Sequence, residues 1–228
     1  MRKLVLFDID GTLVLTGGAG LRAMNMALKN VFGHDDGLAG IPLAGRTDWA
    51  ILSDAVARVG KPLDRDLLET LRRAYIENLA TEIDAPGRGP KAVMPGVREL
   101  LDELRGREDV FVALLTGNFE EGARIKLDHF GLWHYFSCGA YGGDAADRNA
   151  LVPFAVARAR ACGLPPLAAH DVIVVGDTPH DVSCAEAAGA IAVAVATGGH
   201  TVEELRDTRA NLVLPDLSER RTFLELLD

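Results

Sequence analysis

Asp8 and Asp10 interrupt an otherwise apolar run, LVLFDIDGTLV, that extends from Leu4 to Val14. The run is typical of a buried β-strand that ends in a turn. Two ionised carboxylates so close together repel each other, and their dehydration is costly unless a partner compensates for it. The pair therefore indicates a site that needs a partner for its negative charge.

Polar residues follow three other parts of the chain in the same way. ALLTGN places Thr116 at a predicted strand end, VIVVGDTPHD places Asp177 beyond another with Asp181 four residues on, and GGDAADRN places Arg148 at a helix start. The carboxyl ends of parallel strands lie on one edge of a sheet, so we expect Thr116, Asp177 and Arg148 to converge with the first two acids. Several carboxylates at one apolar edge favour Mg²⁺, which takes oxygen ligands and keeps waters that a phosphate can share. Taken singly, each Asp could instead be a turn former or a helix cap.

Strands and helices alternate in the second part of the chain. Continuous apolar runs predict strands at 110–115, 172–175, 190–196 and 212–214, and helical periodicity occurs between them, as in RNALVPFAVARARAC. Strands that are apolar on both faces and separated by helices indicate a parallel sheet covered on both sides. The predicted fold class is therefore α/β, with a doubly wound, Rossmann-like parallel sheet.

Helical spacing alone fills the segment between the first strand and residue 84. It predicts helices at 18–32, 47–59 and 64–82, followed by the Pro- and Gly-rich connection DAPGRGPKAVMPG. We expect two domains, an α/β core of residues 1–15 and 91–228 and a helical cap of residues 16–90, with hinges near Thr16–Gly18 and Pro86–Pro90. The insert leaves at the carboxyl end of a strand, where open α/β sheets bind ligands, so the cap is expected to cover the site.

Composition excludes several classes of function. The chain has 228 residues, 48% of them hydrophobic, and a net charge of −9 without a block of Lys and Arg, so neither nucleic acid nor an anionic membrane is an expected partner. No apolar stretch reaches the ~20 residues needed to span a bilayer, and the apolar start ends in acids without a signal-peptide cleavage site. Cys138, Cys162 and Cys184 form no CxxC pair. We expect a soluble cytoplasmic protein, a monomer or a homodimer.

DIDGT, the Thr of LLTGN and GDTPHD resemble the signature motifs of the haloacid dehalogenase superfamily. The helical insert after the first motif is similar to the phosphoglycolate phosphatase-like branch, and the resemblance covers essentially the whole chain. It implies that Asp8 is the nucleophile, that Asp10 is the general acid and base, and that Mg²⁺ is bound by Asp8, the carbonyl of Asp10 and Asp177. Asp181 is implied as an anchor behind these ligands or as a further ligand.

The same resemblance implies a phosphate-binding loop formed by the Thr116 hydroxyl, the Gly117 N–H and Asn118. The family usually supplies a Lys beside the nucleophile, and we assign that role to Arg148, with a surface pair to Asp144 or Asp147 as the alternative. Lys126 is a rival, but we expect it inside a helix and away from the strand edge. A glycine at position 117, where a bulkier residue is common, is expected to widen the site.

Arg46, in LAGRTDW before a cap helix, is a candidate for binding a substrate anion, with a plain surface Arg as the alternative. The resemblance implies a Mg²⁺-dependent phosphatase whose partner is a small phosphorylated metabolite: it would hydrolyse a small, phosphoglycolate-like monoester through an aspartyl phosphate. A sugar phosphomutase with the same acids is the alternative within the family. A receiver-type signalling module is a distant alternative, because it carries no helical insert and has its phosphoacceptor on a different strand.

Overall fold

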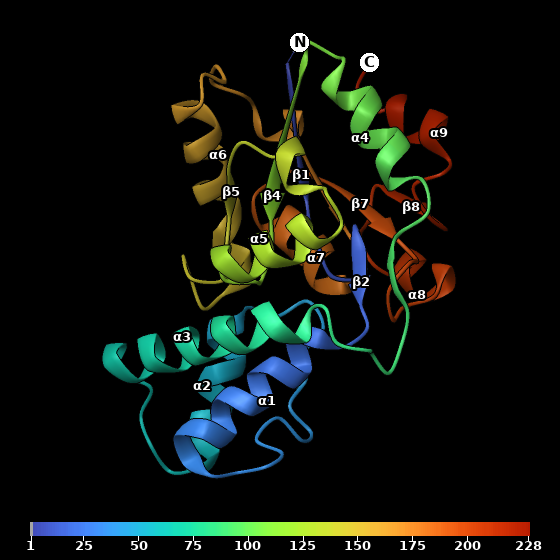
Figure 1. Cartoon of the computed structure of the whole chain (residues 1–228). Helices are drawn as coiled ribbons and strands as arrows, with labels where there is room; N and C mark the ends of the chain where they lie inside the picture. The colour runs from blue at the N-terminus through green and yellow to red at the C-terminus, as the bar shows by residue number, and fades with distance from the viewer. Residues whose placement is uncertain (1) are drawn as a thin grey trace.

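A six-stranded sheet forms the centre of the molecule, and every strand pair in it is parallel (Figure 1). The computed structural model describes residues 2–228. In spatial order the strands are β5 (Gly139–Ala140), β4 (Val110–Leu115), β1 (Lys3–Phe7), β6 (Val172–Gly176), β7 (Ile191–Val195) and β8 (Leu212–Leu214). The predicted α/β class with a doubly wound parallel sheet is confirmed.

The central strand β1 is apolar in both directions because both faces of the sheet are covered. Val5 and Phe7 belong to the hydrophobic cluster on one face, and Leu4 and Leu6 belong to the cluster on the other. All four side chains are completely buried. This alternation follows from the two-residue period of a strand, and it explains why a buried parallel strand reads as a continuous apolar run.

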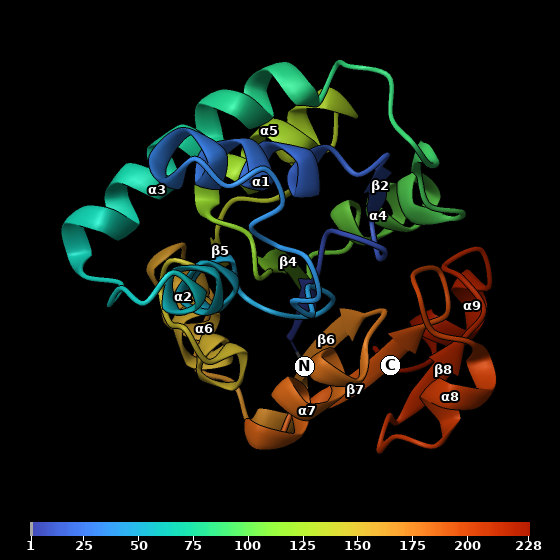
Figure 2. The same ribbon diagram turned by 90° about the horizontal axis from the view of Figure 1, so that it is seen from below.

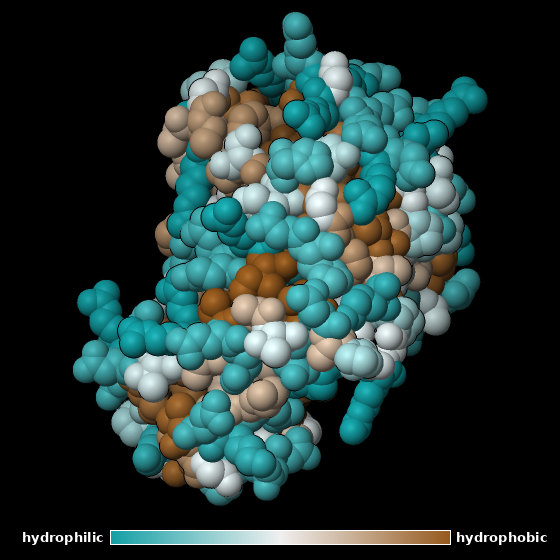
Figure 3. Space-filling view, in the orientation of Figure 1, coloured by the Kyte–Doolittle hydropathy of each residue, from teal (hydrophilic) through white to brown (hydrophobic). Residues whose placement is uncertain are grey.

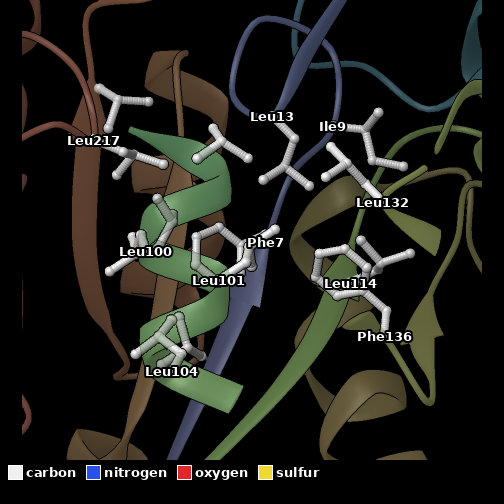
Figure 4. Packing of buried hydrophobic residues seen from close by; sticks show 14 of the residues in the cluster. Phe7, Ile9, Leu13, Leu100, Leu101, Leu104, Leu114, Leu132, Phe136 and Leu217 are labelled. Carbon is white, nitrogen blue, oxygen red and sulfur yellow. The ribbon is translucent and has the colours of Figure 1, made fainter. Parts of the chain in front are cut away.

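Three helices cover each face of the sheet. The side chains of α4 (Val97–Arg105), α5 (Glu120–His129) and α9 (Arg220–Leu224) pack in the cluster that contains Phe7. Figure 4 shows three leucines of α4 around Phe7: Leu100, Leu101 and Leu104. The opposite face packs against α6 (Leu151–Ala161), α7 (Pro179–Ala187) and α8 (Val202–Arg206).

Helices α1 (Ala19–Phe32), α2 (Asp48–Arg58) and α3 (Arg65–Glu82) form a separate body at the carboxyl edge of the sheet (Figures 1 and 2). Their bounds agree with the predicted helices within one or two residues. They share a hydrophobic cluster of their own, to which the core contributes Phe119. We call this body the cap; the domain limits at residues 15/16 and 90/91 stay a prediction.

The crossing between core and cap is a short two-stranded ribbon that the sequence did not reveal. Strand β2 (Val14–Thr16) leaves the core, β3 (Lys91–Val93) returns to it, and the two pair antiparallel. The face seen in Figure 3 is mostly hydrophilic, with hydrophobic side chains in separate patches. Among residues 2–228, no helix combines the length and the hydropathy required to cross a membrane.

Candidate active site

Asp8 lies at the carboxyl edge of the sheet, one residue after β1. Its backbone N–H donates to the carbonyl of Val175 on β6 at 2.9 Å, and its side chain is buried. Asp177 follows β6, and Asp181 lies in the first turn of α7. The carboxylates of the three aspartates each offer an oxygen within 4.8 Å of the others. Asp181 is therefore as much a part of the acidic cluster as Asp177.

Arg148 is the cation of this cluster. Its side chain is buried, and Nη2 lies 3.1 Å from Oδ1 of Asp8 and 2.5 Å from Oδ1 of Asp181. The surface alternative is excluded, because Asp144 pairs with Arg158 instead and the side chain of Asp147 accepts from the backbone N–H of Asn149, two residues on. Arg148 therefore lies where the sequence predicted it, beside the first acid.

The three carboxylates outnumber the cation that faces them, and their proton affinities reflect this. Burial, with a further contribution from Asp181 and Asp10, raises the pKa of Asp8 to about 6 against the lowering effect of Arg148. Burial and the neighbouring carboxylates of Asp181 and Asp8 raise the pKa of Asp177 to about 8. Burial alone would lower the pKa of the Arg148 guanidinium, but the two carboxylates beside it outweigh this and raise it.

A divalent cation fits this donor set. The cluster offers carboxylate oxygens, which Mg²⁺ prefers, and its excess of buried negative charge is what a bound cation would offset. Gly11 keeps the place open: a Cβ at this residue, whose φ is +83°, would lie 2.4 Å from a carboxylate oxygen of Asp177. Asp8, Asp177 and Asp181 are the side chains that would hold the ion.

The side chain of Asp10 turns away from this cluster into a triangle of hydrogen bonds. Oδ2 of Asp10 accepts from Nζ of Lys126 at 2.6 Å and from Nδ2 of Asn118 at 2.8 Å. Nζ of Lys126 also donates to Oδ1 of Asn118 at 2.6 Å, which closes the triangle. The side chain of Asp10 is 44% exposed and that of Lys126 only 5%. The acid therefore faces the open space while its cation lies behind it.

The prediction that Lys126 lies away from the strand edge is wrong. Lys126 is on the buried side of α5 together with Gly122, Ala123 and Leu127. This side of the helix approaches α3 of the cap, where a Cβ at Gly122 would lie 3.6 Å from the ring of Tyr75, and the long lysine side chain reaches back to Asp10. A sequence signal existed: a lysine at helical spacing among apolar positions is placed for burial, and a buried lysine requires a partner.

Of the three predicted residues of the phosphate-binding loop, two line the cavity and one does not. Gly117 and Asn118 line the cavity next to Asp8. Thr116 is completely buried, and its hydroxyl accepts from the backbone N–H of Asn118 at 3.3 Å and from Nδ2 of Asn118 at 2.8 Å. In the described part of the chain Thr116 is not among the cavity-lining residues, so its direct contact with phosphate stays a prediction.

The expectation that Gly117 widens the site is wrong. A Cβ at position 117 would lie 2.0 Å from the carbonyl oxygen of Arg46, so backbone of the cap fills this space. The glycine lets the cap dock: the N–H of Asp48 donates to the Gly117 carbonyl at 2.7 Å, and Oδ2 of Asp48 accepts from the N–H of Phe119 at 2.9 Å. Thr47 adds a bond to the carbonyl of Ala146 at 2.7 Å.

Arg46 lines the cavity, but its guanidinium is held within the cap. Nη1 donates to Oδ2 of Asp54 at 2.8 Å and to the carbonyl of Pro42 at 3.2 Å. Among the lining residues that sequence reasoning did not single out, Asp48 and Tyr75 carry the ionisable side chains. Burial raises the pKa of Asp48 to about 7, with Lys126 lowering it less, and burial raises the pKa of the Tyr75 hydroxyl.

Comparison with known proteins points to one family of hydrolases. The family model described as haloacid dehalogenase-like hydrolase matches residues 5–186. A relative from Dickeya dadantii named "Probable phosphatase IndB" is 29% identical over 96% of this chain and 92% of its own length. A phosphoglycolate phosphatase from Pseudomonas savastanoi pv. phaseolicola is 28% identical over 94% of this chain and 77% of its own. The crystal structure of a hydrolase from Pseudomonas syringae has the same fold, with a TM-score of 0.68 and 22% identity over 99% of this chain and 98% of that one.

Proposed function

The chain belongs to the haloacid dehalogenase-like hydrolases, and from this premise we propose that it is a Mg²⁺-dependent phosphatase acting on a small phosphate monoester. The observation that carries the proposal is the meeting of Asp8, Asp177, Asp181 and Arg148 at one edge of the sheet. The names of the relatives from Dickeya and Pseudomonas support the same activity. The cap above this edge supports a small-molecule substrate, because residues of the core and of the cap together line a cavity there.

Asp8 would act as the nucleophile. One of its carboxylate oxygens forms a bond to phosphorus while the bond between phosphorus and the leaving oxygen breaks, which gives an aspartyl phosphate. Its pKa of about 6 leaves the carboxylate ionised above neutral pH. Arg148 supports this role, because its guanidinium lies 3.1 Å from Asp8 and offers positive charge to the phosphoryl oxygens.

Asp10 would supply and remove the protons. Its carboxyl protonates the leaving alkoxide in the first step, and its carboxylate then takes a proton from the water that attacks the aspartyl phosphate. Both hydrogen bonds from Lys126 and Asn118 go to Oδ2, so Oδ1 is the oxygen that stays available for this transfer. A bound Mg²⁺ would supply charge that favours phosphoryl transfer.

The proposal is tested by phosphate release from p-nitrophenyl phosphate and a panel of small monoesters, with and without Mg²⁺. Asp8→Asn is expected to fold, as measured by circular dichroism, and to lose several powers of ten in turnover. Asp36→Asn, in an exposed loop, is the matched control and keeps full activity. An acid quench of the wild type during turnover, followed by mass spectrometry, traps a phosphorylated chain that Asp8→Asn does not form.

Two results would overturn the proposal. Full activity of Asp8→Asn would remove the nucleophile, and release of phosphate that is indifferent to Mg²⁺ and to chelators would remove the metal. Conversion of a sugar phosphate to its isomer with almost no free phosphate would assign the chain to the phosphomutases instead.

A further inference from the structure

The cavity above Asp8 is much larger than a phosphoryl group. Its volume is about 470 Å³, which lies within the ~300–1,000 Å³ of pockets that hold drug-sized ligands. The phosphoryl end is fixed by Asp8 and Arg148 at the sheet edge, so the remaining space is the place of the leaving alcohol. A two-carbon alcohol would leave most of it unfilled.

Six large aliphatic side chains, which we call the wall, line the cavity. The side chains come from β2, from α1 and α2, and from the loop between these helices: Leu15, Leu21, Met24, Leu38, Leu43 and Ile51. Leu21 is 45% exposed, one of the few large hydrophobic side chains with so much exposure. Met24, Leu38 and Ile51 are otherwise buried in the hydrophobic cluster of the cap. A lining of such apolar side chains is typical of a pocket that binds an apolar group.

The positive charges in the cavity are already paired. Among the described residues, the cationic lining side chains are Arg46, Lys126 and Arg148. Lys126 pairs with Asp10 at 2.6 Å, Arg46 with Asp54 at 2.8 Å, and Arg148 with Asp8 and Asp181. A second anionic group on the substrate would therefore meet a carboxylate beside whichever cation it approached, and the two negative charges would repel each other. The buried carboxyl of Asp48 would also repel it whenever it is ionised.

We propose that the substrate is the monophosphate of an uncharged, largely apolar alcohol, and that esters with a carboxylate, such as phosphoglycolate, are poor substrates. This inference rests on the proposed phosphatase activity and specifies its substrate class. Met24, Leu21 and Leu43 would contact the alkyl or aryl part, while the phosphoryl end stays at Asp8.

A series of n-alkyl phosphates isolates this effect, because the basicity of the leaving alkoxide is nearly constant along it. The expected result is a rise of kcat/KM of about fourfold for each added methylene from methyl to hexyl phosphate, which corresponds to ~0.8 kcal/mol for a buried methylene. Butyl phosphate is expected to exceed the ester of equal length with a terminal carboxylate at least tenfold. Phosphoglycolate serves as the short carboxylated comparison.

Two wall variants and a control tie the effect to this surface. Leu21→Gln and Leu43→Gln change side chains that are not fully buried, so folding is expected to tolerate them. Both should reduce the ratio of kcat/KM for hexyl over methyl phosphate at least fivefold. Met26→Gln alters a 41% exposed side chain of the same helix α1 that does not line the cavity, and it should leave the ratio unchanged.

The outcomes separate the substrate class from the activity itself. Phosphate release with a flat dependence on chain length, or with a preference for the carboxylated esters, would overturn the apolar substrate and leave the phosphatase intact. An unchanged ratio in Leu21→Gln and Leu43→Gln would overturn the assignment of the wall. No release from any ester, including p-nitrophenyl phosphate, would overturn the proposed function and this inference with it.

Discussion

Replacement of Lys126 by Met tests the role of the hydrogen-bonded triangle around Asp10. Met has nearly the same length and shape but donates no hydrogen bond. Lys126 is buried, so the loss of its ion pair is partly offset by the removal of a dehydrated charge. Oδ1 of the buried Asn118 loses its donor, so we expect the free energy of unfolding to fall by about 1–3 kcal/mol.

The expected loss of activity follows from the contacts. Nζ donates to Asp10 and to Asn118, both at 2.6 Å, and a hydrogen bond to a charged group contributes ~1.5–3 kcal/mol. If this energy orients Asp10 for proton transfer, kcat/KM for an alkyl phosphate falls roughly 10- to 150-fold. The loss stays in or below the lowest part of the ~10²–10⁴-fold contribution of a general acid, because Asn118 still donates to Oδ2.

The assay compares two leaving groups. An alkoxide needs a proton as it leaves, whereas p-nitrophenolate leaves without one, so the loss in Lys126→Met should be at least fivefold smaller with p-nitrophenyl phosphate. Lys29→Met is the control, because Lys29 lies on the cap surface with a side chain that is 57% exposed. Equal losses with both leaving groups would show that Lys126 supports the structure rather than Asp10, and the absence of any loss would refute its role altogether.

Three other variants test the surrounding site. Asp48→Asn removes a carboxyl whose pKa is about 7 in the folded state, above its ordinary value of 3.8, so the folded protein binds this proton more tightly than the unfolded chain. As pH rises from 4 to 7, the wild type should therefore lose a few kcal/mol of its free energy of unfolding that Asp48→Asn does not lose. Urea titration of both proteins at each pH measures this, and an equal pH dependence of the two free energies would contradict it. At a pH above about 8, where the carboxyl of Asp177 is ionised, Asp177→Asn removes a buried, repelling charge and should raise Tm in the absence of Mg²⁺. The same variant should abolish the rise in Tm that Mg²⁺ produces in the wild type, and a persisting Mg²⁺-dependent rise would exclude Asp177 as a ligand. Gly117→Ala should lower kcat/KM at least tenfold, because the added Cβ meets the Arg46 carbonyl, and the cap should become more sensitive to limited proteolysis; wild-type values of both would refute the docking contact.

The sequence was sufficient for the sheet because burial on both faces leaves a strong local pattern. The apolar runs around Val5, Val112 and Val174 each became a parallel strand, and the three cap helices followed their hydrophobic spacing. The convergence of Asp8, Asp177 and Arg148 was predictable for a related reason: parallel strands bring their carboxyl ends to one edge. Their catalytic roles stay predictions that the variants above test.

The position of Lys126 was not predictable from the same rule. It lies on a helix, so no strand end indicates its direction, and its partner Asp10 is 116 residues away in the chain. The short strands β2 and β3 were not predicted for another reason. Three residues are too few to show a strand period, and the two strands pair across more than seventy residues of intervening chain. The direction of a long side chain and the pairing of very short strands are determined by tertiary contacts, and the local sequence pattern does not indicate them.

The same two hydrogen bonds, from and to Asp48, dock the cap and hold the predicted phosphate-binding loop of residues 116–118. The carbonyl of Gly117 accepts from the N–H of Asp48, and the N–H of Phe119 donates to the Asp48 carboxylate, so the cap binds the loop from both sides of Asn118. Asn118 in turn donates to Asp10. If the cap moves away, the loop loses these two hydrogen bonds beside Asn118, which holds Asp10, the proposed general acid. The geometry of Asp10 is therefore expected to be complete only when the cap is docked, and this would restrict proton transfer to the closed, water-poor state of the site.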